Sequence, residues 1–306
     1  MRTFRRRTKA IQNSVITIGS FDGIHQGHQV VIKKTIELAR FKNKRAGIVT
    51  FEPSPQQVIY PDFHYILTPV SEKKEILSKL GADFLFLIEF NKSIQALTPA
   101  GFIQSQILSS LHPSTIVVGY DHQFGKDAQG DVKLLKNLAQ EFNFELIIEP
   151  EFKLDGEPVK STRIRERLLL GDMKIANHLL GRNYSIQGSV TKGLGIGKRI
   201  GFPTVNLKVN EIEKLIPADG VYAVLVWYRD KRYLGAMNIG IRPTFHGEKR
   251  TIEASLINIK SNLYGAKLKI ELVARIRPER KFSNPLNLAQ QIKKDIEHAK
   301  VILERH

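Results

Sequence analysis

The sequence predicts two domains of different class: an α/β domain, followed by an antiparallel β-barrel domain that ends in a helix. Through residues 1–182, short apolar runs alternate with segments whose apolar residues recur at helical spacing. From residue 183 onward, the apolar runs have strand length and turn residues separate them. A chain of 306 residues is long enough for two hydrophobic cores. We therefore divide it into domains at 1–182 and 183–306.

The first domain is expected to be doubly wound, a Rossmann-like parallel sheet with helices on both faces. Five short apolar runs are typical of buried parallel strands, at 15–19, 46–51, 83–90, 115–119 and 144–149. Four segments between them have helical spacing, at 29–41, 71–80, 99–111 and 132–141. Ligands of such sheets bind at the carboxyl ends of the strands, so the loops after the strands are the expected site.

The second domain is expected to be an antiparallel barrel of about six strands. Strand-length segments with turn residues between them occur at 184–191, 221–228, 233–239, 251–259 and 267–276. Two short helices are expected to join the domains, at 161–170 and 173–180. A final amphipathic helix over about 285–303 has an apolar stripe made of Leu288, Ile292, Ile296 and Ala299.

The composition excludes several classes of site. The chain has no cysteine, which excludes disulfides, thiol catalysis and thiolate zinc sites and fits a cytoplasmic location. No apolar run approaches the roughly 20 residues that span a bilayer, so we expect no membrane partner. The basic segment at residues 1–7 lacks the apolar stretch of a signal peptide.

The formal net charge of +17 favours anionic partners. Residues 1–182 carry 25 Lys and Arg against 19 Asp and Glu, a net charge of +6; residues 183–306 carry 22 against 11, a net charge of +11. Apart from the arginines at 5–7, the basic residues are scattered, and we find no nucleic-acid-binding module. We therefore expect small phosphorylated molecules as partners and no specific nucleic acid. A basic nucleic-acid-binding protein is the distant alternative, and a homo-oligomer is compatible with the sequence.

The string FDGIHQGH at residues 21–28 joins the first strand to the first helix. Backbone N–H groups and the positive end of the helix dipole form an anion site at such a junction. A spacing of three places His25 and His28 on one face, where two imidazoles suit the charge that develops on a nucleoside triphosphate during transfer. Gly27 allows close backbone approach. A lone histidine here would more simply be a half-buried polar residue, but the whole string favours a phosphate site.

A second glycine-rich string, GLGIGKRIGFPTVN, occupies residues 193–206. Alternating glycines beside Lys198 suggest a loop that binds phosphate through backbone N–H groups. Pro203 argues against a following helix, which excludes a dinucleotide fingerprint. Thr204 and Asn206 alternate in an extended segment, face the same way, and offer oxygen ligands for Mg²⁺ on a nucleotide. A glycine-rich hairpin whose Thr and Asn satisfy turn backbone is equally consistent with this loop alone.

These strings and several others occur in the order found in one known family. The first half contains GSFDGIHQGH at 19–28, TFEP at 50–53, VGYDHQFG at 118–125 and STRIR at 161–165. The second half contains PTVN at 203–206, NIG at 238–240, RPTF at 242–245, IEA at 252–254 and LYG at 263–265. Over nearly its whole length the chain resembles the bifunctional riboflavin kinase/FAD synthetase family of bacteria.

The resemblance implies a flavin-biosynthesis enzyme with a nucleotidyltransferase domain and a kinase domain. The kinase would phosphorylate riboflavin to FMN with ATP, and the adenylyltransferase would convert FMN and ATP to FAD and pyrophosphate. His25 and His28 would stabilise the α-phosphorus of ATP, and Glu253 would accept the riboflavin 5'-hydroxyl proton. ATP phosphates would be bound in the first site by Gly19, Phe21, Gly27, Ser161, Thr162 and Arg165, and in the second by Gly195, Gly197, Lys198, Thr204 and Asn206. Asp121 and Phe124 would bind flavin, and Thr204 and Asn206 would hold Mg²⁺.

Four places depart from the family pattern. His122-Gln123 stands where Phe-Arg is common, and Lys160 stands where the family usually has serine before Ser161. Asn262 stands where an acidic residue is usual, and Lys198 stands where arginine is usual. The first two places lie in the adenylyltransferase half. The alternative to a bifunctional enzyme is therefore a chain that retains one activity, the riboflavin kinase.

Overall fold

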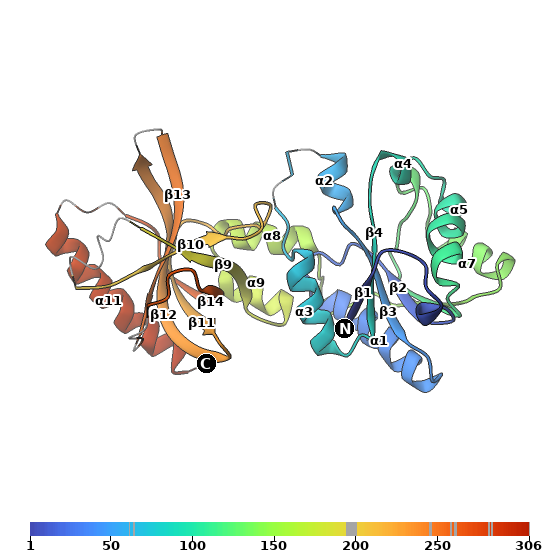
Figure 1. The fold of residues 1–306 in the computed structure, drawn as a ribbon, viewed down its shortest axis with the longest axis horizontal. Coiled ribbons are helices and arrows are strands. Elements are labelled where there is room, and N and C mark those ends of the chain that lie inside the picture. Colours follow the sequence, from blue (N-terminus) through green and yellow to red (C-terminus); the bar gives the residue numbers. More distant parts are fainter. Residues whose placement is uncertain are drawn as a thin grey trace. The chain divides into compact units, whose positions relative to one another are not determined.

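The chain folds into two compact units, Met1–Ser161 and Thr162–His306 (Figure 1). The computed structural model describes residues 1–60, 62–63, 65–193, 201–244, 247–257, 259, 262–280, 282 and 284–305. The first unit contains a six-stranded parallel sheet and the second a closed six-stranded antiparallel barrel. Both predicted fold classes are therefore confirmed.

The sheet of the first unit has the strand order β1-β4-β3-β2-β5-β6, with every neighbouring pair parallel. Its strands are β1 (Arg2–Phe4), β2 (Val15–Ile18), β3 (Ala46–Phe51), β4 (Phe84–Ile88), β5 (Thr115–Gly119) and β6 (Glu145–Glu149). The sequence predicted all of them except β1, whose three residues include a single apolar one. From β2 the chain winds outward to β3 and β4, whereas β5 and β6 lie on the other side of β2. The winding direction thus reverses between β2 and β5.

Helices cover both faces of this sheet (Figure 1). On one face, Ile32 of α1 (Gln26–Phe41) and Leu77 of α3 (Val70–Leu80) share a core with Ile48 of β3. On the other, Phe102 and helix α7 (Val132–Glu141) pack against Val49, the next residue of that strand. Successive residues of a strand point to opposite faces of the sheet. Because helices cover both faces, both sides of β3 are apolar.

The remaining elements of the first unit are short. The expected helix at 99–111 consists of α5 (Pro99–Phe102), a π-helical segment (Ile103–Leu108) and α6 (Ser109–Leu111). Two further helices, a small hairpin and two 3₁₀ turns complete the unit: α2 (Pro55–Ile59), α4 (Lys92–Gln95), β7 (Lys153–Leu154), β8 (Glu157–Pro158), and the turns Lys9–Ile11 and Lys126–Ala128.

The barrel of the second unit closes in the order β10-β13-β12-β11-β14-β9. All its pairs are antiparallel. Its strands are β9 (Tyr184–Thr191), β10 (Val205–Val209), β11 (Gly220–Tyr228), β12 (Lys231–Thr244), β13 (Gly247–Leu256) and β14 (Lys267–Arg277). The helices that accompany it are α8 (Ser161–Leu170), α9 (Met173–Leu180) and α11 (Pro285–Leu303).

Helix α11 packs on the outside of the barrel, against β11, β12 and β14. Ala299 shares a hydrophobic core with Ala223 and Leu225, which lie on the same face of β11. Asp295 lies within the buried side of the helix, where its carboxylate is 2.7 Å from the guanidinium of Arg277. The apolar stripe predicted α11, but it gave no sign of this carboxylate, which is buried because it has an ionic partner.

The side chain of Asn177 joins helix α9 to the barrel by hydrogen bonds. Asn177 Nδ2 donates to the carbonyl oxygen of Leu272 at 2.9 Å, and its Oδ1 accepts from the backbone N–H of Tyr184 at 2.8 Å. Leu179 and Leu180 are buried on the same helix. The compact units divide at 161/162, whereas the sequence placed the boundary of the functional domains at 182/183. The latter remains a prediction about where the two activities separate.

These contacts predict that residues 162–306 form a more stable fragment than residues 183–306. Without α9, the shorter fragment exposes apolar surface of β9 and β14. Each leucine that α9 buries contributes roughly 1.5–3 kcal/mol to the free energy of unfolding. We expect a loss of stability on the order of 3–5 kcal/mol, measured by thermal unfolding of the two fragments. Trp227, the single tryptophan, lies on β11 and reports on the barrel in both. Equal melting temperatures would contradict the structural role assigned to α9.

Candidate active sites

A cavity of about 230 Å³ lies in the first unit where the winding direction of the sheet reverses. Its lining includes His25 and His28, which follow β2, Tyr120 and Asp121, which follow β5, and Glu151, which follows β6. Such a reversal leaves a crevice at the carboxyl ends of the strands, where open α/β sheets bind ligands. The structure thus brings loops far apart in the sequence to one place.

The two histidines are stacked at the N-terminus of α1. Their ring centroids are 3.6 Å apart, with an angle of 18° between the ring planes. His25 is the N-cap residue, and its Nδ1 accepts the backbone N–H of His28 at 3.3 Å. In a neutral His25 ring the proton is therefore on Nε2, which makes that atom a donor. A Cβ added at Gly27 would lie 3.3 Å from the His25 ring, so glycine leaves room for the stack.

The loop between β2 and His25 is strained. Phe21 and Ile24 have φ angles of 45° and 40°, in the left-handed region that non-glycine residues avoid. The ring of Phe21 lies over Gly19, where a Cβ would come within 3.0 Å of it. Ser161, which lines the cavity, donates from Oγ to the carbonyl oxygen of Asp22 at 2.8 Å. The surrounding structure therefore holds this loop in its conformation.

Tyr120 and Glu151 form a hydrogen-bonded pair at the cavity. The Tyr120 hydroxyl donates to Glu151 Oε1 at 2.5 Å, and Lys153 Nζ lies 3.2 Å from Glu151 Oε2. The hydrogen bond to Glu151 raises the pKa of Tyr120 to about 12 and, with that of Lys153, lowers the pKa of Glu151. Sequence analysis gave neither residue a role: Tyr120 lies within the string VGYDHQFG but was not singled out, and Glu151 belongs to no motif. The available signal was that each lies within two residues of the end of a predicted strand.

The other residues proposed for this site lie in different environments. Lys160 and Asp121 line the cavity. Phe124 is buried in the hydrophobic core near Phe102, and it is not part of the cavity lining. Thr162 and Arg165 lie on α8, within the second compact unit.

His122 is a half-buried residue whose ring stacks on Phe124. Its Nε2 is buried and has no hydrogen-bond partner among the described residues. Burial lowers the pKa of His122 to about 4. The ring is therefore neutral in the folded protein at neutral pH, where it acts as an aromatic side chain beside Phe124.

This pKa predicts a loss of stability in acid. The folded state binds the His122 proton only near pH 4, whereas an unfolded histidine binds it near 6.5, so stability falls as the pH falls between these values. From pH 7 to pH 5, His122→Phe should avoid about 2 kcal/mol of the loss. Hydrogen exchange of the β5 amides measures the stability of the first unit at each pH. The control is His298→Gln, a change at an exposed histidine, which should retain the wild-type dependence of stability on pH. If His122→Phe also retains that dependence, burial of His122 is not the cause of the loss of stability in acid.

A second cluster lies on the barrel around Glu253. In the strand register this residue of β13 pairs with Asn206 of β10 on one side and Asn238 of β12 on the other. Thr204 donates from Oγ1 to Glu253 Oε2 at 3.3 Å. Gly193 is needed here, because a Cβ at that position would come within 2.0 Å of Asn206 Nδ2. The structure therefore unites Thr204, Asn206 and Glu253, which the sequence separates by almost fifty residues.

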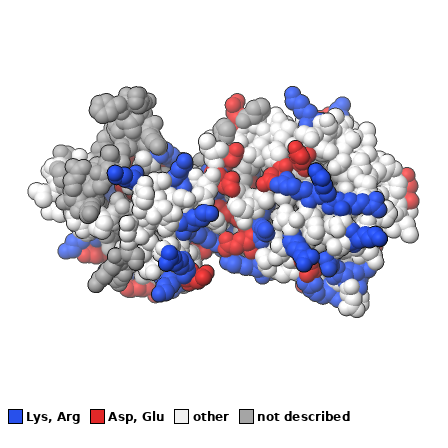
Figure 2. All heavy atoms as spheres, in the orientation of Figure 1, with Lys and Arg blue, Asp and Glu red and all other residues white. Residues whose placement is uncertain are grey.

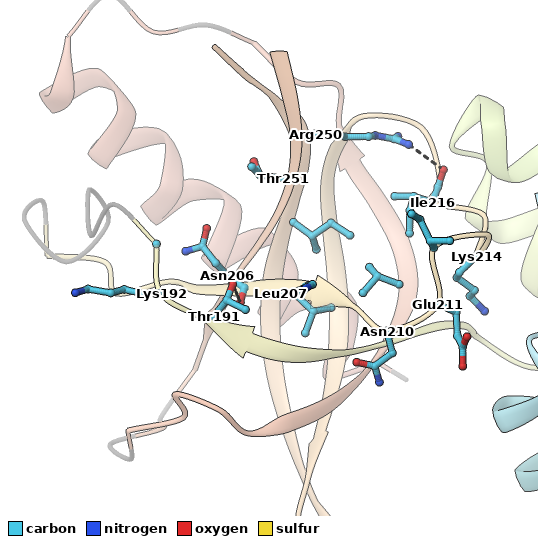
Figure 3. A pocket seen from close by; sticks show the side chains of 15 residues that line it. Thr191, Lys192, Asn206, Leu207, Asn210, Glu211, Lys214, Ile216, Arg250 and Thr251 are labelled. Carbon is cyan, nitrogen blue, oxygen red and sulfur yellow. Dashed lines mark hydrogen bonds between the residues drawn. The ribbon is translucent and has the colours of Figure 1, made fainter. Parts of the chain in front are cut away.

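A cavity of about 1160 Å³ adjoins this cluster and includes Asn206 in its lining (Figure 3). The segment 208–216 forms one wall of this cavity, and Arg250 of β13 is hydrogen-bonded to the end of that segment. Its Nη1 donates to the carbonyl oxygen of Ile216 at 3.3 Å, and its Nε donates to Asp219 Oδ1 at 2.7 Å. Cavities that bind whole small molecules measure roughly 300–1,000 Å³, so this one has room for a nucleotide.

Three residues that the sequence predicts to bind phosphate, Gly195, Gly197 and Lys198, lie outside the described part of the chain. Within the described part, no group of three or more His, Asp or Glu side chains is placed to hold a metal ion. Thr204, Asn206 and Glu253 carry hydroxyl, amide and carboxylate oxygens, the donor types that Mg²⁺ takes. The cluster therefore fits a magnesium ion that arrives with a nucleotide.

Two family models match successive parts of the chain. Residues 7–163 match the model for FAD synthetase, and residues 180–303 match the model for riboflavin kinase. The first match includes the histidine pair and the second includes Glu253. Each candidate site therefore lies in a different matched region.

Curated relatives match almost the whole chain. The bifunctional riboflavin kinase/FMN adenylyltransferase of Bacillus subtilis is 36% identical over 292 residues, covering 94% of this chain and 91% of the relative. The protein of the same name from Listeria monocytogenes is 35% identical over 287 residues, covering 92% and 90%.

A solved structure from Streptococcus pneumoniae has the same fold, with a TM-score of 0.87 and 30% identity over 96% of this chain and 97% of that one. That structure is described as a macrolide-efflux protein. Nowhere in the described part of this chain is a helix both long and apolar enough to cross a membrane.

Proposed function

The chain belongs to the family of bifunctional riboflavin kinase/FMN adenylyltransferases, and from that premise we propose that its two reactions are divided between the two sites described above. It phosphorylates riboflavin to FMN and adenylylates FMN to FAD. The barrel cluster around Glu253 is proposed as the kinase site, and the His25/His28 cavity as the adenylyltransferase site. The observation that carries this proposal is that each unit has its own cavity with groups suited to phosphate chemistry.

In the adenylyltransferase site, a phosphate oxygen of FMN would attack the α-phosphorus of ATP. A new P–O bond forms, the bond from the α-phosphorus to the bridging oxygen breaks, and pyrophosphate leaves. Negative charge develops on the α-phosphate oxygens, where Nε2–H of His25, the ring of His28 and the positive end of the α1 dipole would stabilise it. The cavity volume of 230 Å³ suits the reacting phosphates rather than a whole nucleotide.

Further residues would hold the ATP phosphates in this site. Ser161 lines the cavity and begins α8, and Thr162 and Arg165 follow it on the same helix. Hydroxyl groups and the N–H groups of a helix N-terminus can donate hydrogen bonds to phosphate oxygens, and arginine can bind two of these oxygens at once. Lys160 adds a positive charge to the lining.

In the kinase site, Glu253 would accept the proton of the riboflavin 5'-hydroxyl while its oxygen attacks the γ-phosphorus of ATP. The bond from the γ-phosphorus to the β,γ-bridging oxygen breaks, and ADP leaves. Thr204 and Asn206 would hold Mg-ATP beside this carboxylate, and Gly195, Gly197 and Lys198 would bind its phosphates. The magnesium ion would neutralise charge on the phosphates.

The domain boundaries and the partners form part of the same proposal. Adenylyl transfer is assigned to residues 1–182 and phosphorylation to residues 183–306, supported by the family matches at 7–163 and 180–303. The partners are ATP and flavins, and the cysteine-free composition supports a cytoplasmic location. Figure 2 shows Lys and Arg interspersed with Asp and Glu on the face drawn, where nucleic-acid binding would favour a basic stripe.

Two assays on the full-length chain test the proposal. Riboflavin with Mg-ATP should yield FMN, and FMN with Mg-ATP should yield FAD and one equivalent of pyrophosphate. Formation of FMN without release of pyrophosphate from FMN and ATP would refute the adenylyltransferase assignment and leave the kinase assignment standing. Formation of FAD and pyrophosphate from FMN and ATP, without formation of FMN from riboflavin, would refute the kinase assignment.

A further inference from the structure

Lys73 is a buried lysine on α3 to which neither reaction assigns a role. Its side chain is 3% exposed, and its Nζ donates to the carbonyl oxygen of Ser20 at 2.6 Å. Thr50 donates from Oγ1 to the same carbonyl at 3.0 Å. Burial lowers the pKa of Lys73, and the nearby charges of Asp22 and Glu52 oppose this effect. A buried amine is costly, so an apolar side chain would serve stability better at this position.

The carbonyl that Lys73 holds lies at the start of the strained loop. Ser20 is five residues before His25, and the left-handed residues Phe21 and Ile24 lie between them. Further along, the carboxylate of Asp22 accepts the backbone N–H groups of Leu67 and Thr68, at 3.1 and 2.9 Å. A strained loop keeps its conformation only where the surroundings determine it. Lys73 therefore acts on the segment that presents the histidine pair.

We propose that Lys73 is a positioning residue for adenylyl transfer. By fixing the Ser20 carbonyl, its amine holds residues 19–25 in the conformation that stacks His25 on His28 over the cavity. Leu111 of α6 is buried in the other core of the first unit, which contains no residue of this loop, so it supplies stability away from the loop. The inference rests on the proposed role of the histidine pair in FAD formation.

The test is Lys73→Met, which keeps the length and apolar stem of the side chain but removes the donor. The kcat of FAD formation should fall about 10- to 100-fold, because displacement of a catalytic group by a fraction of an ångström to 1 Å has effects of this size. The KM for ATP should change little, since the histidines act mainly in the transition state. Riboflavin phosphorylation by the same molecules should be unchanged and provides an internal control.

Chemical rescue separates positioning from packing. Because the chain has no cysteine, Lys73→Cys creates a single thiol. Alkylation with 2-bromoethylamine while the protein is unfolded, followed by refolding, restores an amine at the length of lysine. The alkylated protein should regain most of the kcat of FAD formation, whereas unalkylated Lys73→Cys taken through the same steps should not.

Leu111→Ala is the matched control for lost stability. It should destabilise the first unit by about 2–5 kcal/mol, yet retain FAD formation at temperatures well below unfolding. An equal loss of kcat in Leu111→Ala and Lys73→Met, or no recovery after alkylation, would overturn the inference. Normal FAD formation by Lys73→Met would overturn it too and leave the proposed function intact. Absence of FAD with the unmodified chain would overturn both.

Discussion

Glu253→Gln is expected to lower the turnover of riboflavin phosphorylation by roughly 10²–10⁴-fold, the usual contribution of a general base. Glutamine keeps the shape of the side chain and can still accept the hydrogen bond from Thr204. It cannot take a proton from the riboflavin 5'-hydroxyl, so the loss should appear in kcat. The measurement is steady-state formation of FMN from riboflavin and Mg-ATP.

Two controls accompany this variant. FAD formation from FMN should be unchanged, because the cavity proposed for adenylyl transfer is lined only by residues of the first unit, whereas Glu253 lies on the barrel. Glu271→Gln, on β14 of the same barrel, removes another strand carboxylate and should retain kinase activity. Near-normal FMN formation by Glu253→Gln would rule out Glu253 as the base.

His25→Asn is expected to lower FAD formation by about 10²–10³-fold, the effect of removing one donor that stabilises transition-state charge. Asparagine places an acceptor oxygen where His25 Nδ1 accepts the N–H of His28, so the helix cap is kept. The substitution removes the Nε2–H donor. Release of pyrophosphate from FMN and ATP measures the effect.

His25→Ala separates the cap from the chemistry. Alanine removes both the cap and the donor, so it should lose the same activity and in addition about 0.5–2 kcal/mol of stability. Kinase activity should persist in both variants. If His25→Asn forms FAD at the wild-type rate and His25→Ala does not, the histidine acts through the helix cap alone, and its proposed catalytic role is wrong.

Periodicity and turn residues predicted most of the fold. The apolar runs of β2 to β5 were visible because burial on both faces requires apolar residues. The strand β6 was visible as a short apolar run, and the barrel segments through their length and the turn residues between them. The strand β1, of three residues, has too few apolar positions to show a pattern. The π-helical segment 103–108 was equally hidden, since its hydrogen bonds join residues five apart instead of four and its apolar residues look much like those of an α-helix.

The candidate sites were predictable where residues form compact strings. The stack of His25 on His28 and the approach of Thr204 to Glu253 agree with roles that the resemblance implied, although those roles remain predictions. Tyr120 and Glu151 were missed, because their pairing depends on which loops the sheet brings together. Lys73 was also missed. A helical lysine usually faces solvent, and only the fold reveals that this one points inward.

The reversal of winding between β2 and β5 also bears on how such a protein can diverge. The cavity is built from loops, while the strands beneath it carry the core. Loop positions such as Lys160 can therefore accumulate substitutions that alter substrate contacts at little cost to folding. A change within β2 or β5 would disturb packing on both faces of the sheet at once. New substrate preferences in related proteins are thus expected to arise at the strand ends, where selection can act on ligand binding separately from stability.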